Sequence, residues 1–457
     1  MDFQSVVIIV AALLTLSIGI EAAKGVKTFR DFAISPGHFS HFSLVSSIVA
    51  TTVGGGTILG MAEKSFTFGP VIYLVGVAYG CLYLFLGLAL SKRVEKYLGK
   101  ALTLGDIIAE HYGSTARHVI AVLWVVFCMG LLLTQINALS KVLGAFTHLQ
   151  PFWITLYGMA LIIIYSSLGG IRAVVKTDIL QFLILVTCLG AALGISTYYT
   201  NDLALTVPHL KALSTTQVVV LFLTFMFSGL IYPTTFQFFL MSKNTQMAKQ
   251  CFVISAFLCA LSFGIGTSFG LIAFANNPTL APSDAVPYVF NHLLPLWMLP
   301  FAVTALIAVV MSTADSLLNS LAVSVVNDII RPYCKEKHFG QREMLYARGI
   351  CLAFGVLVTV LSLGTQIDTL DIFVYSLQIW LPTVGGILVA MFFGKTVSPR
   401  GLYISMFIGG ATMITWNVLG LTAHTDITAL FPSFLCNQAT FWSFHFFETR
   451  AQKVVTA

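Results

Sequence analysis

A run of about twenty uncharged residues extends from Phe42 to Met61 and reads FSLVSSIVATTVGGGTILGM, which is long enough for a helix to cross a bilayer. Its centre holds three adjacent glycines, Gly54, Gly55 and Gly56. Each glycine costs about 1 kcal/mol against alanine in a helix interior. The run therefore predicts either a broken membrane helix with free carbonyl groups that bind an ion or solute, or a face that packs closely against another helix. Three glycines in a row favour the break.

The composition excludes a soluble protein. Hydrophobic residues make up 57% of the 457 residues, charged residues make up 9%, and the mean hydropathy is +0.90. We therefore predict an all-α polytopic membrane protein whose main partner is the lipid bilayer. The net charge of +6 is explained by basic cytoplasmic loops and requires no nucleic-acid partner. The eight cysteines show no CxxC or zinc-site spacing, so they are expected to be free thiols.

Apolar segments of spanning length recur along the whole chain and predict a single transmembrane domain over residues 1–457. The first segment is expected to be a retained span, because no basic residue precedes it as in a cleaved signal. Thirteen spans are predicted, near residues 4–22, 42–62, 68–91, 118–146, 152–168, 178–199, 216–240, 250–275, 296–326, 346–365, 368–394, 401–421 and 426–447.

The distribution of basic residues predicts the orientation of these spans. Alternate loops contain 21 of the 24 lysines and arginines, whereas the opposite loops contain only Lys64, Lys141 and Lys211. Basic loops face the cytoplasm. The N-terminus is therefore expected outside the cell membrane and the C-terminus in the cytoplasm.

A second interrupted span predicts internal symmetry. The segment at 216–240 is broken by Ser228-Gly229 and by Pro233. Two broken helices that lie five spans apart and cross in opposite directions are expected in a five-plus-five inverted repeat. The repeats would cover residues 42–199 and 216–394, with a first span at 4–22 and peripheral spans at 401–447.

The segment at 296–326 contains the residue types of a cation site. Ser312 and Thr313 are adjacent, and Val309 precedes them by three and four positions. Helical hydroxyl groups often bond to such carbonyls, so three oxygen atoms converge here. Two carbonyls from an unwound Phe42–Met61 segment would complete an oxygen shell for a hard cation such as sodium. The alternative is that the two hydroxyl groups only pack or bond within their own helix.

Two aspartates lie within apolar segments, and each allows two interpretations. Asp315 is either an ion- or substrate-binding group or a side chain that faces a hydrated cavity. Asp178 is either functional or, together with Gln181, forms a capping box at the start of a helix.

Three motifs resemble those of the sodium/solute symporter family, which includes sodium/proline, sodium/glucose, sodium/iodide and high-affinity choline transporters. The motifs are YSSLGGIRAVVKTDILQ at 165–181, MSTADSLLNS at 311–320 followed by Asn327-Asp328, and GDIIAEHYG at 105–113. The resemblance implies a fold of the leucine-transporter type. It also implies symport of a small organic solute with co-transported sodium by alternating access, in a chain for which the monomer is sufficient.

The resemblance also implies functional residues. The sodium site would use the carbonyls of Ala50, Val53 and Val309 and the hydroxyls of Ser312 and Thr313. Asp178 matches an acidic residue that serves a second sodium or ion release, and Asp315 lies one turn beyond the hydroxyl pair. The substrate is expected beside the two breaks, at Thr52, Gly54, Gly55, Gly56, Thr57, Tyr232, Phe236 and Gln237.

The substrate and the coupling ion each have an alternative. Thr52 stands where sodium/proline members carry aspartate, and Phe238 follows Gln237 where many members carry arginine. The glycine-rich and STADS segments look most like the choline branch. Aromatic residues would suit such a quaternary amine, and those considered are Tyr79, Trp124, Phe127, Tyr232 and Phe236. Proton coupling is the alternative mechanism. No HExxH, GxSxG or paired-histidine motif indicates an enzyme, and a fused sensor domain is not expected.

Overall fold

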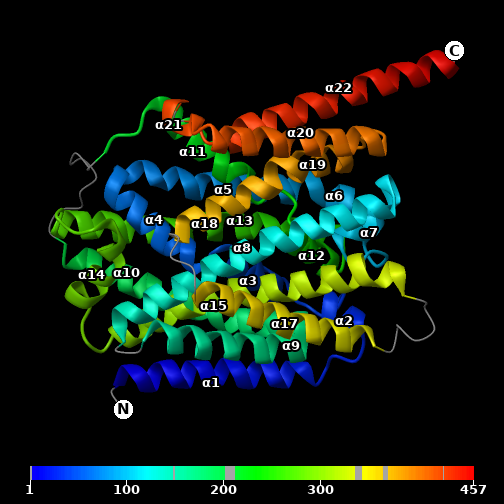
Figure 1. Cartoon of the computed structure of the whole chain (residues 1–457). Coiled ribbons are helices and arrows are strands. Elements are labelled where there is room, and N and C mark those ends of the chain that lie inside the picture. The colour runs from blue at the N-terminus through cyan, green and yellow to red at the C-terminus, as the bar shows by residue number, and fades with distance from the viewer. Residues whose placement is uncertain are drawn as a thin grey trace.

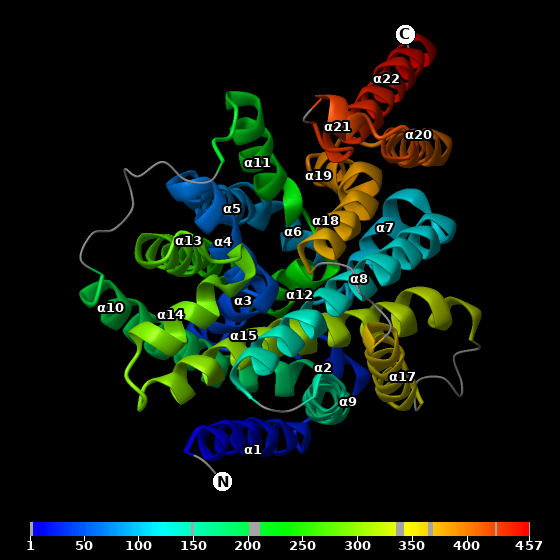
Figure 2. The ribbon, with the colours of Figure 1, turned by 60° about the vertical axis from the view of Figure 1, so that its left-hand side comes forward.

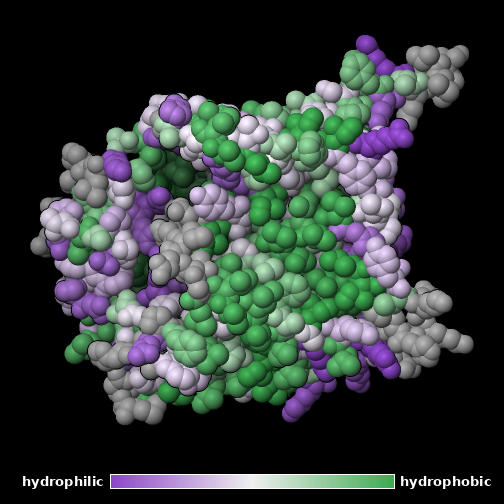
Figure 3. Space-filling model, viewed as in Figure 1, coloured by the Kyte–Doolittle hydropathy of each residue, from purple (hydrophilic) through white to green (hydrophobic). Residues whose placement is uncertain are grey.

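The computed structural model describes residues 3–147, 150–200, 211–334, 342–363, 369–425 and 427–456, and in these ranges every regular element is a helix. The long helices run roughly along one direction (Figure 1). α1 (Phe3–Ala23) forms one edge, and α20 (Pro399–Val418) and α22 (Leu430–Thr456) form the opposite edge. Apolar side chains cover the middle of the face shown in Figure 3, and hydrophilic side chains gather toward the two ends of the helices, as expected of a protein that crosses a bilayer.

Several helices begin with side-chain caps that the sequence supplies. Ser40 Oγ accepts a hydrogen bond from the Ser43 amide at the start of α3 (His41–Thr52), and Thr103 with Asp106 forms a capping box on α7 (Leu104–Tyr112). Such caps satisfy amide groups that lack a partner within the helix. The α-helices not treated individually below are α2 (Phe29–Ala33), α5 (Tyr73–Phe85), α6 (Ser91–Val94), α10 (Gly190–Tyr198), α13 (Thr245–Asn276), α14 (Ala285–Leu293), α17 (Glu343–Leu363), α18 (Thr369–Trp380), α19 (Gly386–Phe392) and α21 (Leu421–Thr425).

The predicted break in the glycine-rich segment is present. α3 ends at Thr52, Val53 and Gly54 have non-helical backbone angles, and α4 (Gly55–Phe68) then begins. The break includes only the first glycine of the triplet, because Gly55 and Gly56 already belong to the first turn of α4. α3 lies near the centre of the helix assembly in both ribbon views (Figures 1 and 2).

The second predicted break is also present. α11 (Thr215–Ser228) and α12 (Pro233–Met241) meet at an angle of 48°. Pro233 begins α12, where its missing N–H group costs nothing. Ile231 adopts a positive φ of 49°, an uncommon conformation for a β-branched residue.

The segments at 152–168 and 178–199 are joined more tightly than predicted. They form α9 (Pro151–Ile184), a short π-helical segment and α10, and the only irregular residue within α9 is Gly170. Gly170 has a φ of 51° and a ψ of −145°, and a Cβ there would lie 2.5 Å from the Phe32 ring, so the position suits glycine alone. Both ends of this segment lie beside the same helix, since Phe146, just before α9, packs on Phe290 of α14, and α10 also contacts α14. The chain therefore reverses at Gly170.

By length and hydropathy, eight helical segments of the described part can cross a membrane, or nine if α11 and α12 count as one span. Some of these segments join two predicted spans, as α9 and α10 do. The number thirteen therefore stays a prediction, as do the proposed limits of the single domain and of its repeats.

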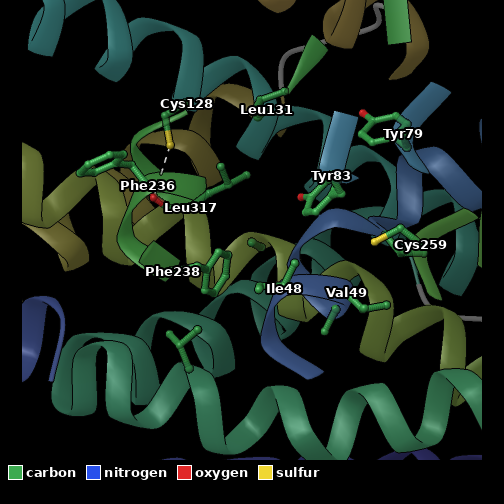
Figure 4. Close-up of a cluster of buried hydrophobic side chains, with 14 of the residues drawn as sticks. Ile48, Val49, Tyr79, Tyr83, Cys128, Leu131, Phe236, Phe238, Cys259 and Leu317 are labelled. Carbon is green, nitrogen blue, oxygen red and sulfur yellow. Dashed lines mark hydrogen bonds between the residues drawn. The ribbon is translucent and has the colours of Figure 1, made fainter. Parts of the chain in front are cut away.

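The core lies where α3, α8 (Ser114–Phe146), α12 and α15 (Leu299–Ser324) meet. Figure 4 shows apolar side chains from these helices and from α5 and α13 around the unwound segment. Trp124 and Trp380, both fully buried, lie edge to face with ring centroids 5.5 Å apart. α15, the helix that carries the predicted hydroxyl pair, contacts both broken helices through α3 and α12.

Candidate functional site

The predicted oxygen cluster assembles between α3 and α15. Ser312 Oγ donates to the carbonyl oxygens of Ala50 (2.8 Å) and Val309 (3.0 Å). Thr313 Oγ1 lies 3.3 Å from the Val309 oxygen and 3.5 Å from the Ala50 oxygen. Both side chains are buried. Four of the five predicted sodium ligands therefore meet in one place.

Two residues at the end of α3 differ in their relation to the hydroxyl pair. Val53 is fully buried at the end of α3, but none of the described hydrogen bonds of the hydroxyl pair involves its carbonyl oxygen. Thr313 Oγ1 bonds instead to the carbonyl oxygen of Thr51 at 3.1 Å. Thr51 was not predicted, because only the three-dimensional structure shows which carbonyls of an unwound turn face the neighbouring helix.

A cavity of about 90 Å³ lies directly beside this cluster. Five of the eight predicted substrate residues line it, and these are Thr52, Gly54, Gly56, Thr57 and Tyr232. Thr313 also lines the cavity, so the same side chain contacts both the cavity and the carbonyl cluster. A solute in the cavity and an ion in the cluster would share this wall.

The other three predicted substrate residues do not line the cavity. The amide of Gly55 donates to Gln135 Oε1 at 3.1 Å, and a Cβ at Gly55 would lie 2.1 Å from Val310 Cγ2. Phe236 is buried and stacks on Phe392, while Gln237 Nε2 donates to the Ala33 carbonyl oxygen at 3.2 Å. These residues build the wall behind the cavity.

Residues outside the eight predicted substrate positions complete the cavity. Tyr79 and Tyr83 of α5 face it, and the hydroxyl groups of Tyr83 and Thr52 bond to each other; Figure 4 shows both tyrosines beside the unwound segment. Thr234 lies in the wall, and its buried Oγ1 has no hydrogen-bond partner among the described residues. Trp124 and Phe127, which were also considered, pack behind Tyr232. The further lining residues that were missed include Leu131, Thr134, Gln135, Phe225 and Phe373.

The two intramembrane aspartates are both fully buried. Asp178 lies inside α9 and accepts a hydrogen bond from Ser47, so its interpretation as a helix cap is wrong. The helix continues through this position because the chain reversal occurs at Gly170, two turns earlier. Asp315 accepts a hydrogen bond from the Tyr165 hydroxyl at 2.6 Å, so its interpretation as a solvated side chain is also wrong.

Charged clusters at the end of the bundle complete the three sequence motifs. Arg117 Nη2 donates to Asp106 Oδ1 (2.8 Å), and its Nε donates to Asp328 Oδ1 (3.1 Å). Arg172 Nη2 donates to Asp31 Oδ1 at 3.1 Å. The motif residues therefore hold helix ends together.

Comparison with known proteins identifies the family. The profile of the sodium:solute symporter family matches residues 32–409. The chain belongs to this family. It is 24% identical over 450 residues to an osmoregulated proline transporter of Bacillus subtilis, which covers 92% of this chain and 90% of that protein. It is 27% identical over 359 residues to a high-affinity choline transporter of Caenorhabditis elegans, of which it covers 60%.

A solved structure shows the same fold. The outward-open, substrate-bound structure of a sodium-coupled sialic acid symporter superposes with a TM-score of 0.84 over 98% of this chain and 97% of that chain, at 17% sequence identity. The predicted all-helical fold of sodium-coupled transporters is therefore confirmed. This sodium:solute symporter is a multi-pass membrane protein that couples transport of a small solute to sodium, which is the co-transported ion.

Proposed function

We propose that this symporter moves one sodium ion with one compact organic solute per cycle. The observation that carries the proposal is the double contact of Thr313, which touches the Thr51 carbonyl in the oxygen cluster and lines the neighbouring cavity. An ion at the cluster would fix the unwound end of α3, and this end forms part of the cavity. Sodium binding would thereby shape the solute site, and this relation is what coupling requires.

The proposed sodium ligands are the carbonyls of Ala50, Val53 and Val309 and the hydroxyls of Ser312 and Thr313. Val309 offers no hydroxyl for a second sodium one turn earlier in α15, which supports a single ion. One sodium that crosses 100 mV gains about 2.3 kcal/mol, and a tenfold gradient adds about 1.4 kcal/mol. Together they support several-hundred-fold accumulation of a neutral solute. Asp178 and Asp315 are assigned to ion release or to a second ion.

The cavity favours a compact solute without net charge. Its volume of about 90 Å³ is smaller than that of an engineered cavity of about 150 Å³ that admits benzene. None of the described residues that line it is charged, so a net charge on the solute would have no counter-ion. Threonine hydroxyl groups on one wall and aromatic rings on the other suit a solute with both polar and apolar parts.

A quaternary amine such as choline is the second candidate. The aromatic side chains of Tyr79, Tyr83, Tyr232 and Phe225 line the cavity, and aromatic faces attract a cation without requiring a carboxylate. The relatives named above include a choline transporter as well as a proline transporter. The aromatic wall alone favours the cation, whereas the absence of acidic lining residues favours the solute without net charge.

The proposed orientation places the N-terminus outside and the C-terminus in the cytoplasm of the cell membrane. The asymmetry of the basic loops supports it, although Lys335 and Lys337 lie outside the described residues. The cavity and the oxygen cluster are both built from one chain, which supports the proposal that a monomer is sufficient for transport.

The test is uptake into vesicles that contain the purified chain. A panel of labelled neutral, zwitterionic and quaternary ammonium solutes is offered under an inward sodium gradient, under an equal potassium gradient, and under a proton gradient alone. We expect uptake of a small neutral or zwitterionic solute that requires sodium, with one sodium per solute from the reversal potential. Uptake driven equally by the proton gradient without sodium would contradict the proposal, and selective uptake of choline would favour the second candidate.

A further inference from the structure

A shallow pocket with basic walls lies beyond α5, at the end of the bundle where α6 and α7 lie (Figure 1). Its volume is about 470 Å³, and the residues that line it are Lys92, Arg93, Glu95, Lys96 and Phe392. We call it the basic pocket. The first four residues belong to α6 and the helical turn after it, whereas Phe392 is the last residue of α19. The basic pocket is therefore built from both predicted repeats.

The segment that forms the basic pocket carries an excess of positive charge. Residues 92–100 contain four basic side chains, with Lys100 after the three that line the pocket, and one carboxylate, that of Glu95. Among the described residues none of these five side chains takes part in an ion pair. Arg30 of α2 adds a positive charge beside the same segment, because its Nη2 donates to the Gly99 carbonyl oxygen at 2.6 Å. A ligand with negative charge is therefore attracted to this end of α6.

Arg93 is held in a fixed position between the two repeats. Its guanidinium carbon lies 3.7 Å from the centre of the Phe393 ring, and its Nη1 donates to the Ala89 carbonyl oxygen. This is the only hydrogen bond of the Arg93 side chain in the described part of the chain, so other N–H groups of the guanidinium remain for a ligand. The planar fork of arginine matches two oxygen atoms of a phosphate, and a fork that is already fixed loses less entropy on binding.

Apolar side chains next to the basic pocket indicate that the phosphate belongs to a lipid. Leu88, one turn before Lys92, is 58% exposed, and Phe393 is 38% exposed. Phe85 of α5 stacks on Phe393 with ring centroids 6.2 Å apart, so this apolar surface continues along the spanning helix. A free phosphate ion or an acidic peptide would leave these side chains uncovered. A phospholipid covers them with its acyl chains while its headgroup reaches the basic side chains.

We propose that the basic pocket binds the phosphate group of an anionic phospholipid. In the proposed orientation this end of the bundle faces the cytoplasm, where the membrane leaflet carries anionic lipids. The phosphate contacts α6 of the first repeat, and Arg93 connects it to Phe393 of the second. The bound lipid thereby stabilises the conformation in which these two helix ends are close. The basic pocket shares no lining residue with the solute cavity, so the inference goes beyond the proposed function and does not depend on it.

Aromatic packing connects the basic pocket with a helix that lines the solute cavity. Phe392 in the wall of the basic pocket stacks on Phe236 of α12, with ring centroids 5.5 Å apart. α12 contributes Thr234 and Phe238 to the wall of the solute cavity. A lipid that holds the Phe392 side chain in place therefore also restrains α12.

The test measures lipid binding to the purified full-length chain in a neutral detergent. Phosphatidylglycerol and phosphatidylcholine with identical acyl chains are titrated, and native mass spectrometry counts the bound lipid molecules. We expect one phosphatidylglycerol per chain to bind roughly tenfold more tightly than phosphatidylcholine. Each basic side chain near an anionic lipid contributes about a fivefold gain in affinity, so Lys92→Gln combined with Lys96→Gln should weaken phosphatidylglycerol binding about 25-fold.

The matched control is Lys24→Gln combined with Lys27→Gln, which removes the same charge just after α1. Both lysines are exposed, and neither has an ion pair in the described structure. The control should leave the affinity for phosphatidylglycerol unchanged. Equal affinity of the parent for the two lipids, or an equal loss in the control and in the Lys92 and Lys96 variant, would overturn the proposal.

Competition separates a lipid from a soluble anion. Inorganic phosphate and a polyglutamate peptide are added to the chain with bound phosphatidylglycerol, and neither should displace the lipid at an equal concentration. Displacement by phosphate would overturn the lipid site in favour of a soluble phosphate, and displacement by the peptide would overturn it in favour of an acidic protein partner.

Thermal unfolding tests the connection between the repeats. Phosphatidylglycerol should raise the unfolding temperature of the parent, because it binds the folded chain. The rise should be smaller in Phe393→Leu, where Arg93 loses its contact with the end of α19. An equal rise in the parent and in Phe393→Leu would overturn the role of the lipid in joining the two repeats.

Discussion

Ser312 Oγ lies 2.8 Å from the carbonyl oxygen of Ala50, although 262 positions separate the two residues in the chain. Ser312 belongs to the second predicted repeat and Ala50 to the first. Alternating access requires the two repeats to move relative to each other. An ion that binds to both residues would therefore stabilise the conformation in which they are close, and its release would permit the opposite one.

Loss of either hydroxyl group is expected to weaken sodium activation. Ser312→Ala and Thr313→Ala each remove one oxygen ligand, and loss of a hydrogen-bonding group at a buried site costs about 1–3 kcal/mol. This corresponds to a roughly 5- to 150-fold higher sodium concentration for half-maximal uptake. The measurement is initial uptake rate against sodium concentration in vesicles.

The matched control for these variants is Ser405→Ala. Ser405 is also a buried helical serine, bonded to the Gly401 carbonyl at 2.7 Å, but it lies in the peripheral α20. It should leave the sodium dependence unchanged. Equal sodium dependence in Ser312→Ala, Thr313→Ala and the control would remove the proposed ion site.

Gly54→Ala is expected to disturb the ion site and the cavity together. A Cβ at this position would lie 2.9 Å from Gln135 Oε1 and 3.0 Å from Thr313 Oγ1. Gln135 must move and the Thr313 hydroxyl must shift by a few tenths of an ångström, which disturbs its contacts with the carbonyl cluster. We expect at least a tenfold loss in apparent sodium affinity, which is about 1.4 kcal/mol. Gly144→Ala in α8 is the control, because its Cβ meets nothing within 4 Å; it should be neutral or stabilising by up to about 1 kcal/mol. An unchanged sodium affinity in Gly54→Ala would show that Thr313 does not bind the ion.

The sequence predicted the two helix breaks well, because each depends on local chemistry. Adjacent glycines weaken one helix, and Pro233 cannot continue another. The oxygen cluster at Ser312 and Thr313 was also predictable in part, since its intrahelical contacts follow from helix geometry. The contact of Ala50 with this pair was expected from the family resemblance, whereas other contacts across helices were not predictable. Thr51 and Tyr83 enter the site through the packing of α3 against its neighbours, which leaves no periodic signal in either segment.

The failed interpretation of Asp178 as a helix cap has a single physical cause. Asp178 was considered as a helix cap because a polar cluster precedes an apolar segment, and this pattern is typical of a helix start. The chain instead reverses at Gly170, where the backbone angles suit only glycine. Asp178 consequently lies about two turns inside the helix, whereas the pattern indicated a position at the start of the helix. The same shift explains why Asp178 meets Ser47 inside the bundle rather than water.

Arg117→Ala is expected to destabilise the fold strongly. Arg117 bridges Asp106 and Asp328, and the Asp328 side chain is only 3% exposed. Removal of the guanidinium group leaves a buried carboxylate without its counter-ion, which typically costs about 3–5 kcal/mol. Thermal unfolding in detergent measures the loss. Arg117→Lys keeps the charge but not the forked geometry, so its unfolding temperature should lie between those of the parent and Arg117→Ala.

A double variant tests whether this effect comes from the pair. Asp328→Asn combined with Arg117→Ala removes the uncompensated charge, so the double variant should be less destabilised than the sum of the single variants. Strict additivity would show that Arg117 acts through packing alone.

The contact between Asp31 and Arg172 should make stability depend on pH in the acidic range. Burial raises the pKa of Asp31, but hydrogen bonds from Thr28 and the charge of Arg172 outweigh this effect and hold the pKa below its ordinary value of 3.8. A carboxyl group whose pKa is lowered by folding stabilises the native state above the unfolded-state pKa, and this contribution disappears as the pH falls through the folded-state pKa. Asp31→Asn should therefore be less stable than the parent at neutral pH, and the difference should vanish in acid.

The expected difference is about 1 kcal/mol, because both side chains are partly exposed and solvent screens the ion pair. The unfolding temperature of the parent and of Asp31→Asn is compared in detergent from neutral pH to about pH 3. Both chains carry His38→Gln, since His38 Nε2 lies 3.0 Å from Arg172 Nη2 and is a further partner of this guanidinium group. Asp284→Asn serves as control, with no ion pair in the described structure. If the difference in unfolding temperature between the parent and Asp31→Asn grows as the pH falls, the ionised Asp31 side chain does not stabilise the native state. This result would contradict the prediction.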